Sequence, residues 1–300
     1  MSHVVNGVSP LSLPLGSFRD ERLHRNLRLG EGLLQVTRRG DISAIVRSAA
    51  TNPMRLFIPR RKSPVPHVYT SSYGGGLLAG DQTDLLVQLD EGSRCVLSSQ
   101  ASTKIYKNPR GLPCSQTMQA RIGRAATLVL VPEPISCFAG SRYDQIQRFD
   151  IAATGNLVLV DWVTSGRYAV GERFQFTHYQ SRQSIYYDDQ LVIEDAVRLV
   201  PAEGPLESKF RLGHYNCSGL MIILGEQFQT LGEQLLARER EQSLQQGGDV
   251  LTVTQPLPHG IPGVLMRVLS VETQDAKRCF EGLLRHIDPI LGTRSWVGKF

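Results

Sequence analysis

The residues of this sequence that could do chemistry are carboxylates that stand singly among apolar neighbours in strand-like segments. They are Asp81, Asp84, Asp161, Glu172, Glu194 and Asp195. Thr103 and Lys104, and the run Ser165, Gly166 and Arg167, have the same setting. A charge in such a position lies either on the solvent face of a half-buried sheet or along a hydrated space inside the protein. The residues alone leave both interpretations open.

A run of glycines precedes the first of these carboxylates. Residues 74–79, GGGLLA, satisfy the Gly-x-Gly-x-x-Gly/Ala form of the dinucleotide-binding fingerprint. That kind of site needs a buried strand before the loop and a helix N-terminus after it. Here the preceding VYTSSY is polar, the following DQTDLLVQLDEG alternates as a strand does, and no Gly-Lys-Ser/Thr of a P-loop follows. We therefore expect no nucleotide site. The glycines instead predict a bulge or a close backbone approach inside a sheet, at which Asp81 is presented.

The sequence holds no complete constellation for nucleophilic or metal-assisted hydrolysis. It has neither a Gly-x-Ser-x-Gly elbow nor a His-Glu-x-x-His pair, and HYNC at 214–217 is too small a motif to indicate a metal site. The five cysteines stand far apart with no Cys-x-x-Cys pair. This usage favours reduced thiols in a cytoplasmic protein over a disulfide framework or a zinc site.

The elements that must position these residues are mostly strands. Between about 25 and 215, short apolar–polar alternations are separated by turn residues at intervals of about ten, which is typical of a sandwich, barrel or superhelix. Helical periodicity predicts one helix over 225–241 and another from Thr273, a candidate cap, to a stop at Pro289. The apolar stripes of these helices are expected to pack against the sheet, or else to meet a partner.

We therefore expect a mainly β fold, with a superhelical or sandwich-like sheet body and a few helices, mostly in the C-terminal third. A flexible N-terminal tail is predicted over 1–20, and a single β-rich domain over 21–300. Within that domain the β body covers about 25–215 and a mixed α/β part about 216–300.

Composition argues against several functional classes. The net charge of +5 is spread over 300 residues, and the basic clusters at 37–40 and 59–64 are short and have no aromatic-rich basic stretch beside them. We therefore expect no nucleic-acid binding. No apolar run approaches the roughly 20 residues of a membrane span, so no membrane association is expected. The N-terminus lacks the charged and apolar regions of a signal peptide, which again favours a cytoplasmic location.

Six stretches occur in a specific order and spacing. They are GGLLAGD (75–81), ASTKIYK (101–107), PEPISCFAGSRYDQ (132–145), DWVTSGRYAVGERF (161–174) and, more weakly, GVLMRVLSVE (263–272) and LGTRSW (291–296). Together they resemble the urease accessory protein D family, called H in some bacteria. Two positions depart from the family pattern: Ala79 stands where Gly is usual, and Lys107 where Arg is common. Neither departure removes a carboxylate.

The resemblance implies a β-rich, non-enzymatic scaffold. Such proteins bind the urease apoprotein and accessory protein F, which recruits the GTPase accessory protein G that carries nickel. A dimer within that F, D and G assembly is a further expectation. The family is also thought to provide a passage for Ni(II) in transit, with no permanently bound cofactor and no stable metal site.

By position, the resemblance places Asp81 and Glu172 in the motifs associated with that passage. Asp161, Thr103 and Lys104 are weaker carry-overs. The residues expected to shape the motifs are Gly75, Gly76, Gly80, Tyr106, Gly166, Arg167 and Gly171.

The residue types agree with a conduit better than with catalysis. A conduit must bind nickel weakly and release it, which suits isolated carboxylates, carbonyls and water rather than a closed His and Cys cage. Polar groups that face inward from strands also need water inside the wall. The alternative hypothesis is a β-rich enzyme or small-ligand binder that uses Asp81, Lys104, Tyr106 and Arg167 as a polar pocket.

Overall fold

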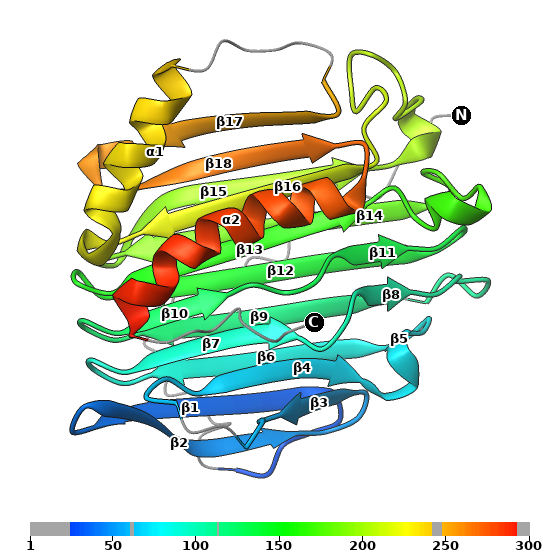
Figure 1. The fold of residues 1–300 in the computed structure, drawn as a ribbon. Coiled ribbons are helices and arrows are strands. Elements are labelled where there is room, and N and C mark those ends of the chain that lie inside the picture. Colours follow the sequence, from blue (N-terminus) through cyan, green and yellow to red (C-terminus); the bar gives the residue numbers. More distant parts are fainter. Residues whose placement is uncertain (1–24, 61–62, 113, 242–247, 293–300) are drawn as a thin grey trace, which may run out of the picture.

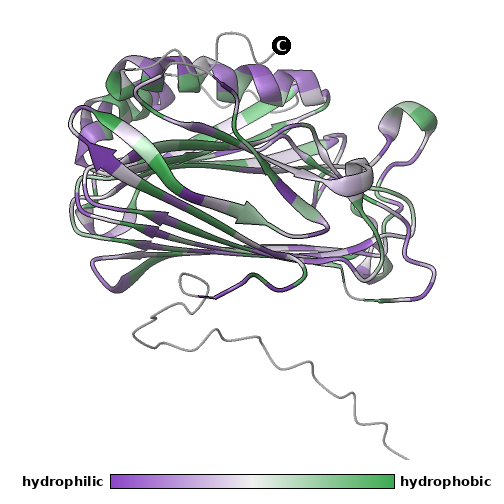
Figure 2. Cartoon of the chain, turned by 90° about the horizontal axis from the view of Figure 1, so that it is seen from below, coloured by the Kyte–Doolittle hydropathy of each residue, from purple (hydrophilic) through white to green (hydrophobic). Residues whose placement is uncertain are grey.

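The computed structural model describes residues 25–60, 63–112, 114–241 and 248–292. These residues form two stacked β-sheets with two α-helices on the outer face of the larger sheet (Figure 1, Figure 2). The predicted tail at 1–20 and the last four residues of LGTRSW lie outside the described residues. No helix among the described residues is long and apolar enough to cross a membrane.

The strands and helices follow one another in this order: β1 (Glu31–Arg39), β2 (Ile42–Ala50), β3 (Met54–Phe57), β4 (His67–Ser72), β5 (Gly76–Leu77), β6 (Gln82–Leu89), β7 (Arg94–Ser99), β8 (Thr103–Ile105), β9 (Ser115–Ile122), β10 (Thr127–Leu130), β11 (Ile135–Cys137), β12 (Arg142–Ile151), β13 (Asn156–Thr164), β14 (His178–Tyr187), β15 (Gln190–Leu199), β16 (Cys217–Leu224), α1 (Gln229–Glu241), β17 (Val250–Pro256), β18 (Gly263–Ser270) and α2 (Thr273–Leu291).

The chain alternates between the two sheets. The smaller sheet has the order β15-β14-β12-β9-β6-β1-β2, and the larger runs β17-β18-β16-β13-β10-β7-β4-β3 with β11, β8 and β5 attached to it. The strands β6, β9, β12 and β14 pair in parallel in the smaller sheet, as β4, β7, β10 and β13 do in the larger. Each pass of the chain therefore adds one strand to each sheet. The result is a β-solenoid-like superhelix, which confirms the predicted mainly β fold.

The two helices cover the outer face of the larger sheet. The edge of the Phe280 ring of α2 meets Trp162 of β13 with 5.5 Å between ring centroids. Leu231 and Leu235 of α1, and Leu284 of α2, are buried in the same cluster. The apolar stripes predicted from the sequence therefore pack against the sheet, and their burial supplies the hydrophobic stabilisation of this layer.

The ends of the helices differ from the sequence prediction. A 3₁₀ turn at Glu226–Phe228 precedes α1, so the α-helix begins at Gln229. The cap of α2 is Glu272 rather than Thr273, without a side-chain hydrogen bond. Pro289 was expected to stop α2 but lies inside it, because the proline ring is compatible with helical φ and costs only one backbone hydrogen bond in the last turn. The helix instead ends at Leu291, and its C-cap Gly292 adopts the left-handed conformation with φ of 67°.

Candidate functional site

The side chains of β12 that face the interior change from aromatic to polar to apolar along the strand. Successive side chains of a strand point to opposite faces, so Tyr143, Gln145, Gln147, Phe149 and Ile151 share the inner face. Tyr143 belongs to one apolar cluster, and Phe149 and Ile151 to another. The two glutamines between them are buried, with exposed fractions of 6% and 8%.

The neighbouring strands repeat this change at the same level. The register places Thr83, Gln116, Gln145 and Ser181 in one row across β6, β9, β12 and β14. It places Gln147, Gln183 and Asp195 in the next row, across β12, β14 and β15. Asp161 faces these rows from β13 of the larger sheet and bonds to them. We call the eight residues Thr83, Gln116, Gln145, Gln147, Ser181, Gln183, Asp195 and Asp161 the polar belt. Because it crosses the strands, the polar belt follows the axis of the superhelix.

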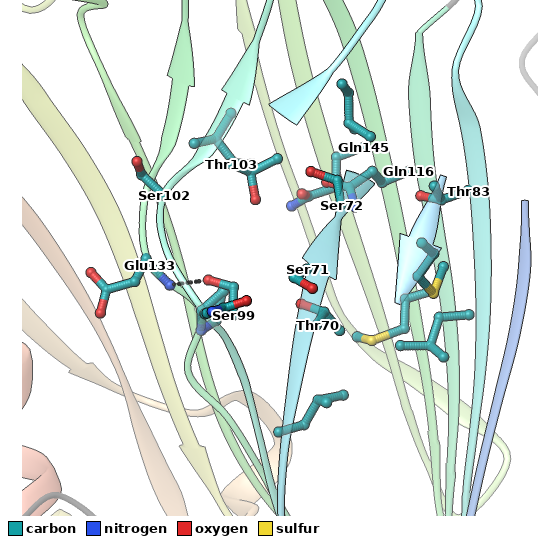
Figure 3. Close-up of a pocket in the computed structure, with 18 of the residues that line it drawn as sticks. Thr70, Ser71, Ser72, Thr83, Ser99, Ser102, Thr103, Gln116, Glu133 and Gln145 are labelled. Carbon is teal, nitrogen blue, oxygen red and sulfur yellow. Dashed lines mark hydrogen bonds between the residues drawn. The ribbon is translucent and has the colours of Figure 1, made fainter. Parts of the chain in front are cut away.

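A cavity of about 430 Å³ lies between the sheets at one end of the polar belt. Its walls include five belt residues, namely Thr83, Gln116, Gln145, Gln147 and Asp161. The facing wall carries hydroxyl groups from the larger sheet, those of Thr70, Ser72, Ser99 and Thr103 (Figure 3). The lining is mixed, with apolar side chains such as Met54, Leu85 and Trp162 beside these hydroxyl and amide groups. The hydroxyl and amide groups supply the two to four polar partners that a water molecule in a cavity needs.

Two carboxylates line this cavity, the half-buried Glu133 and the buried Asp161, which has an exposed fraction of 8%. Its Oδ1 accepts a hydrogen bond from Gln145 Nε2 at 2.8 Å, and its Oδ2 accepts from Ser181 Oγ at 2.8 Å and from Gln183 Nε2 at 2.5 Å. Burial raises the pKa of Asp161 above its usual value of 3.8, and these three donors oppose that rise. The charge of Asp195 adds to the rise in the pKa of Asp161, so the two carboxylates interact electrostatically.

Glu172 is held in an ion pair and is not among the residues that line the cavity. Its Oε2 accepts from Arg167 Nε at 2.9 Å and from the backbone N–H of Ala139 at 3.2 Å, while Arg167 Nη2 donates to Oε1. These hydrogen bonds, Arg167 first, lower the pKa of Glu172. Arg167 also lies over the Phe138 ring, 4.3 Å from its centroid. The backbone bends tightly here, since a Cβ on Gly166 would lie 2.9 Å from the Glu172 carbonyl oxygen.

Gly171, four residues beyond Arg167, ends the 3₁₀ turn Tyr168–Val170 in the left-handed conformation. The motif DWVTSGRYAVGERF thus contributes one cavity carboxylate, Asp161, and one turn fixed by the Arg167–Glu172 pair.

The glycine-rich segment forms a turn and a close strand contact, as predicted. A 3₁₀ turn at Tyr73–Gly75 leads into β5, where a Cβ on Gly76 would lie 2.5 Å from the carbonyl oxygen of Lys104 in β8. Gly80 has a φ of 96°, and Asp81 then closes the turn by accepting a hydrogen bond from the N–H of Leu78 at 2.8 Å. The strand β6 follows at once, where a nucleotide site would need a helix.

Thr103 and Lys104 are neighbours on β8 with different surroundings. Thr103 lines the cavity, whereas Lys104 is exposed. Tyr106, on the same segment, packs its ring edge-on against Phe138 with centroids 5.3 Å apart. Of the four residues of the alternative small-ligand pocket, Asp81, Lys104, Tyr106 and Arg167, none lines the cavity.

The structure thus brings Asp161 and Thr103 together at one cavity and places Asp81, Glu172 and Lys104 outside its lining. Sequence reasoning missed the amide and hydroxyl side chains of the polar belt. The period-two pattern of one strand was the available signal. In HYQSRQSIYY it puts Ser181 and Gln183 on the same face as the buried Tyr179 and Ile185. Among the described residues, no group of three or more His, Cys, Asp or Glu side chains is arranged to hold a metal ion.

The fold and this site define a class: a β-solenoid-like protein with a polar belt and a cavity between its two sheets. Residues 29–297 match the family model described as UreD urease accessory protein. The chain is 35% identical to the urease accessory protein UreD of Anaeromyxobacter sp. (strain Fw109-5), over 94% of this chain and 93% of that protein.

Two further relatives agree. Identity is 32% to the urease accessory protein UreD of Sorangium cellulosum (strain So ce56), over 91% of this chain and 85% of that protein. Identity is 31% to the urease accessory protein D of Oryza sativa subsp. indica, over 87% of this chain and 93% of that protein. The chain belongs to the UreD urease accessory protein family.

Proposed function

We propose that this protein is a non-enzymatic urease maturation factor that binds apo-urease and accessory proteins F and, through F, G, and that conducts Ni(II) along its polar belt. Family membership supports the role in urease maturation. The observation that carries the conduit is the cavity of about 430 Å³ between the sheets, with hydroxyl groups on one wall and the Asp161 carboxylate at the belt.

The chemistry of the belt suits an ion in transit. Carboxylate, hydroxyl and amide oxygens can replace part of the water around a divalent cation without forming the soft thiolate or multi-imidazole cage that would hold nickel tightly. The negative charge of Asp161 attracts the cation, and its three hydrogen-bond donors keep the carboxylate in one orientation. Because a proton competes for the same oxygens, the raised pKa of Asp161 makes the carboxylate a weaker ligand as the pH falls.

Binding of large partners requires surfaces other than the helix stripes, which pack against the sheet. Large apolar side chains are exposed on two turns: Tyr73 (53%) and Leu78 (59%) flank β5, and Val170 (68%) lies in the turn Tyr168–Val170. Contiguous exposed apolar surface marks sites of protein–protein contact. We place partner contacts on these turns.

The test blocks the cavity without changing the outer surface. Thr103→Phe places a ring in the cavity, and Lys104→Phe places the same ring on the adjacent exposed position of β8 as a matched control. Urease activity is measured in cells that express the urease subunits, accessory proteins F and G, and each variant. We expect Thr103→Phe to lower activation strongly and Lys104→Phe to leave it near the wild-type level.

Co-purification of the variants with apo-urease and accessory protein F separates the two parts of the proposal. Retained complexes with lost activation support the conduit. Full activation by a folded Thr103→Phe variant would refute the conduit but leave the scaffold role, and absence of any complex with the wild-type chain would refute the scaffold.

A further inference from the structure

The strand β2 forms one edge of the smaller sheet, at the end of the superhelix where the described chain begins (Figure 1). No strand among the described residues pairs with its outer edge. It is nine residues long, ISAIVRSAA, and carries a single charged residue, Arg47. An edge strand presents unpaired backbone N–H and C=O groups, and a long apolar edge strand is a template for pairing with another chain. The strand β2 has this form.

Other edge strands have features that discourage such pairing. The strands β3 and β5 are only four and two residues long. The strand β15 carries the exposed charges of Glu194 and Arg198, and β17 ends at Pro256 and contacts α1. Short length, charges, prolines and cover by a helix are the usual protections of a sheet edge. A β-bulge leaves Val46 of β2 without a partner on β1, but this bulge adds neither a charge nor a proline.

Apolar side chains are exposed beside this open edge. Four of them lie on β2 and at the end of β3, namely Ile42, Val46, Phe57 and Ile58. The strands β2 and β3 contact each other, and the Ser43 N–H donates to the Pro64 carbonyl oxygen at 2.8 Å, so the segment after β3 runs beside the start of β2. Exposed apolar surface of this kind marks sites of protein–protein contact.

The charges near β2 favour an acidic partner. Residues 25–60 contain seven arginines and two carboxylates. Both carboxylates already face an arginine, at N–O distances of 2.7 and 3.9 Å, whereas Arg39 and Arg60 are exposed. Complementary charges favour association, and like charges placed against each other oppose it. A second copy of this chain would bring its own arginines to the same edge, so the charges favour a different, acidic protein.

We propose that β2 is a strand-addition site, at which an extended segment of an acidic partner protein pairs along the outer edge of β2 and extends the seven-stranded smaller sheet. The segment is apolar at alternate positions, where it meets the exposed side chains of β2, and its carboxylates face the arginines. In strand addition the backbone hydrogen bonds supply affinity and the alternate side chains supply specificity. That the partner is apo-urease or accessory protein F rests on the proposed function.

The test compares three exposed aliphatic side chains on three edge strands. Val46 of β2, Leu191 of β15 and Val253 of β17 have exposed fractions of 43%, 45% and 42%, so replacing each by glutamate is a matched change. Binding of the full chain to apo-urease and, separately, to accessory protein F is measured by isothermal titration calorimetry. We expect Val46→Glu to weaken one of the two complexes at least about tenfold, because it places a negative charge between apolar strands and next to an acidic segment. Leu191→Glu and Val253→Glu should bind as the wild type does.

Hydrogen exchange distinguishes strand addition from contact through side chains alone. In one of the two wild-type complexes the backbone amides of β2 should exchange more slowly than in the free chain, while those of β15 should not change. Circular dichroism first shows whether the three variants are folded. If Val46→Glu does not fold, the exchange of β2 in the wild-type complexes decides the question alone.

The outcomes separate this site from the proposed function. If the three variants bind equally well, or exchange at β2 is unchanged in both complexes, the strand-addition site is overturned and the scaffold role remains. A wild-type dimer that Val46→Glu converts to a monomer identifies a second copy as the occupant and also overturns the proposal. Absence of any complex with the wild-type chain overturns the scaffold role and this site together. Urease activation by Thr103→Phe bears on the conduit alone.

Discussion

The role of Asp161 can be separated from its contribution to the fold by two substitutions. Asp161→Asn keeps one acceptor oxygen, which can receive the donors of Ser181 and Gln183. Its new amide group then faces Gln145, whose side-chain amide can rotate by 180° to present oxygen. The turned Gln145 nitrogen meets the Tyr143 hydroxyl, which donates to Gln116 Oε1 at 2.6 Å and has lone pairs free to accept. The side chain at position 161 and its partners Gln145, Ser181 and Gln183 therefore all keep hydrogen-bond partners.

The expected changes in the free energy of unfolding follow from how many buried groups keep a hydrogen-bond partner. For Asp161→Asn we expect a change within about 1 kcal/mol, since a charge-assisted bond is weakened while an unfavourable buried charge is removed. Asp161→Leu removes the acceptor of three buried donors, and at about 1 kcal/mol or more for each it should destabilise by about 3 kcal/mol. Urea unfolding at neutral pH measures both. Because both substitutions remove the carboxylate, both should lower urease activation.

The pH dependence of stability gives a further check on Asp161→Asn. The pKa of Asp161 is raised above its usual value of 3.8 in the folded protein, so the folded state holds the proton more tightly than the unfolded state. The stabilisation by this proton is complete below that usual value and is lost as the pH rises through the folded pKa. Asp161→Asn should therefore gain stability relative to the wild type as the pH rises from about 4. Destabilisation of Asp161→Asn by more than about 2 kcal/mol at neutral pH, or full urease activation by Asp161→Asn, would refute the reasoning.

Three other substitutions test the local geometry. Gly76→Ala should lower the free energy of unfolding by about 2 kcal/mol, because its Cβ would press against the backbone oxygen of Lys104 at 2.5 Å and force β5 from β8. Gly282→Ala in α2, where an added Cβ meets nothing within 4 Å, should instead raise the free energy of unfolding by about 1 kcal/mol. Thermal unfolding compares the two glycine variants, and equal effects on their stability would contradict the expected contrast. Glu172→Gln should destabilise the protein at neutral pH. The pKa of Glu172 is lowered in the folded protein, so its pairing with Arg167 stabilises the fold above the usual carboxyl pKa. This stabilisation is lost as the pH falls through the folded pKa. A loss of stability that persisted unchanged at acidic pH, followed by urea unfolding, would argue against that ion pair.

The glycine segment was predictable because its constraint is local. Alternation after Asp81 ruled out the helix that a dinucleotide site needs, and the structure has the strand β6 there. The close approach expected at the glycines occurs at Gly76. Period-two and period-3.6 patterns likewise gave the mainly β body and both helices, since these patterns reflect burial on one face of an element. The stop of α2 was misplaced at Pro289, since a proline in the last turn is tolerated where a following glycine supplies the cap.

The sequence by itself therefore determined the class of fold, the family, and the presence of isolated carboxylates without a closed metal cage. Only the tertiary structure decided which carboxylates face inward. Asp161 accepts hydrogen bonds from amide and hydroxyl side chains of the polar belt, and the buried Asp195 pairs with Arg267. Glu172 is instead paired with Arg167, and Asp81 closes a turn. The physical reason is the parallel register of the superhelix. Residues such as Thr83, separated by some hundred positions from Asp195, come into one belt only when each pass of the chain stacks on the last, and no local pattern records that alignment.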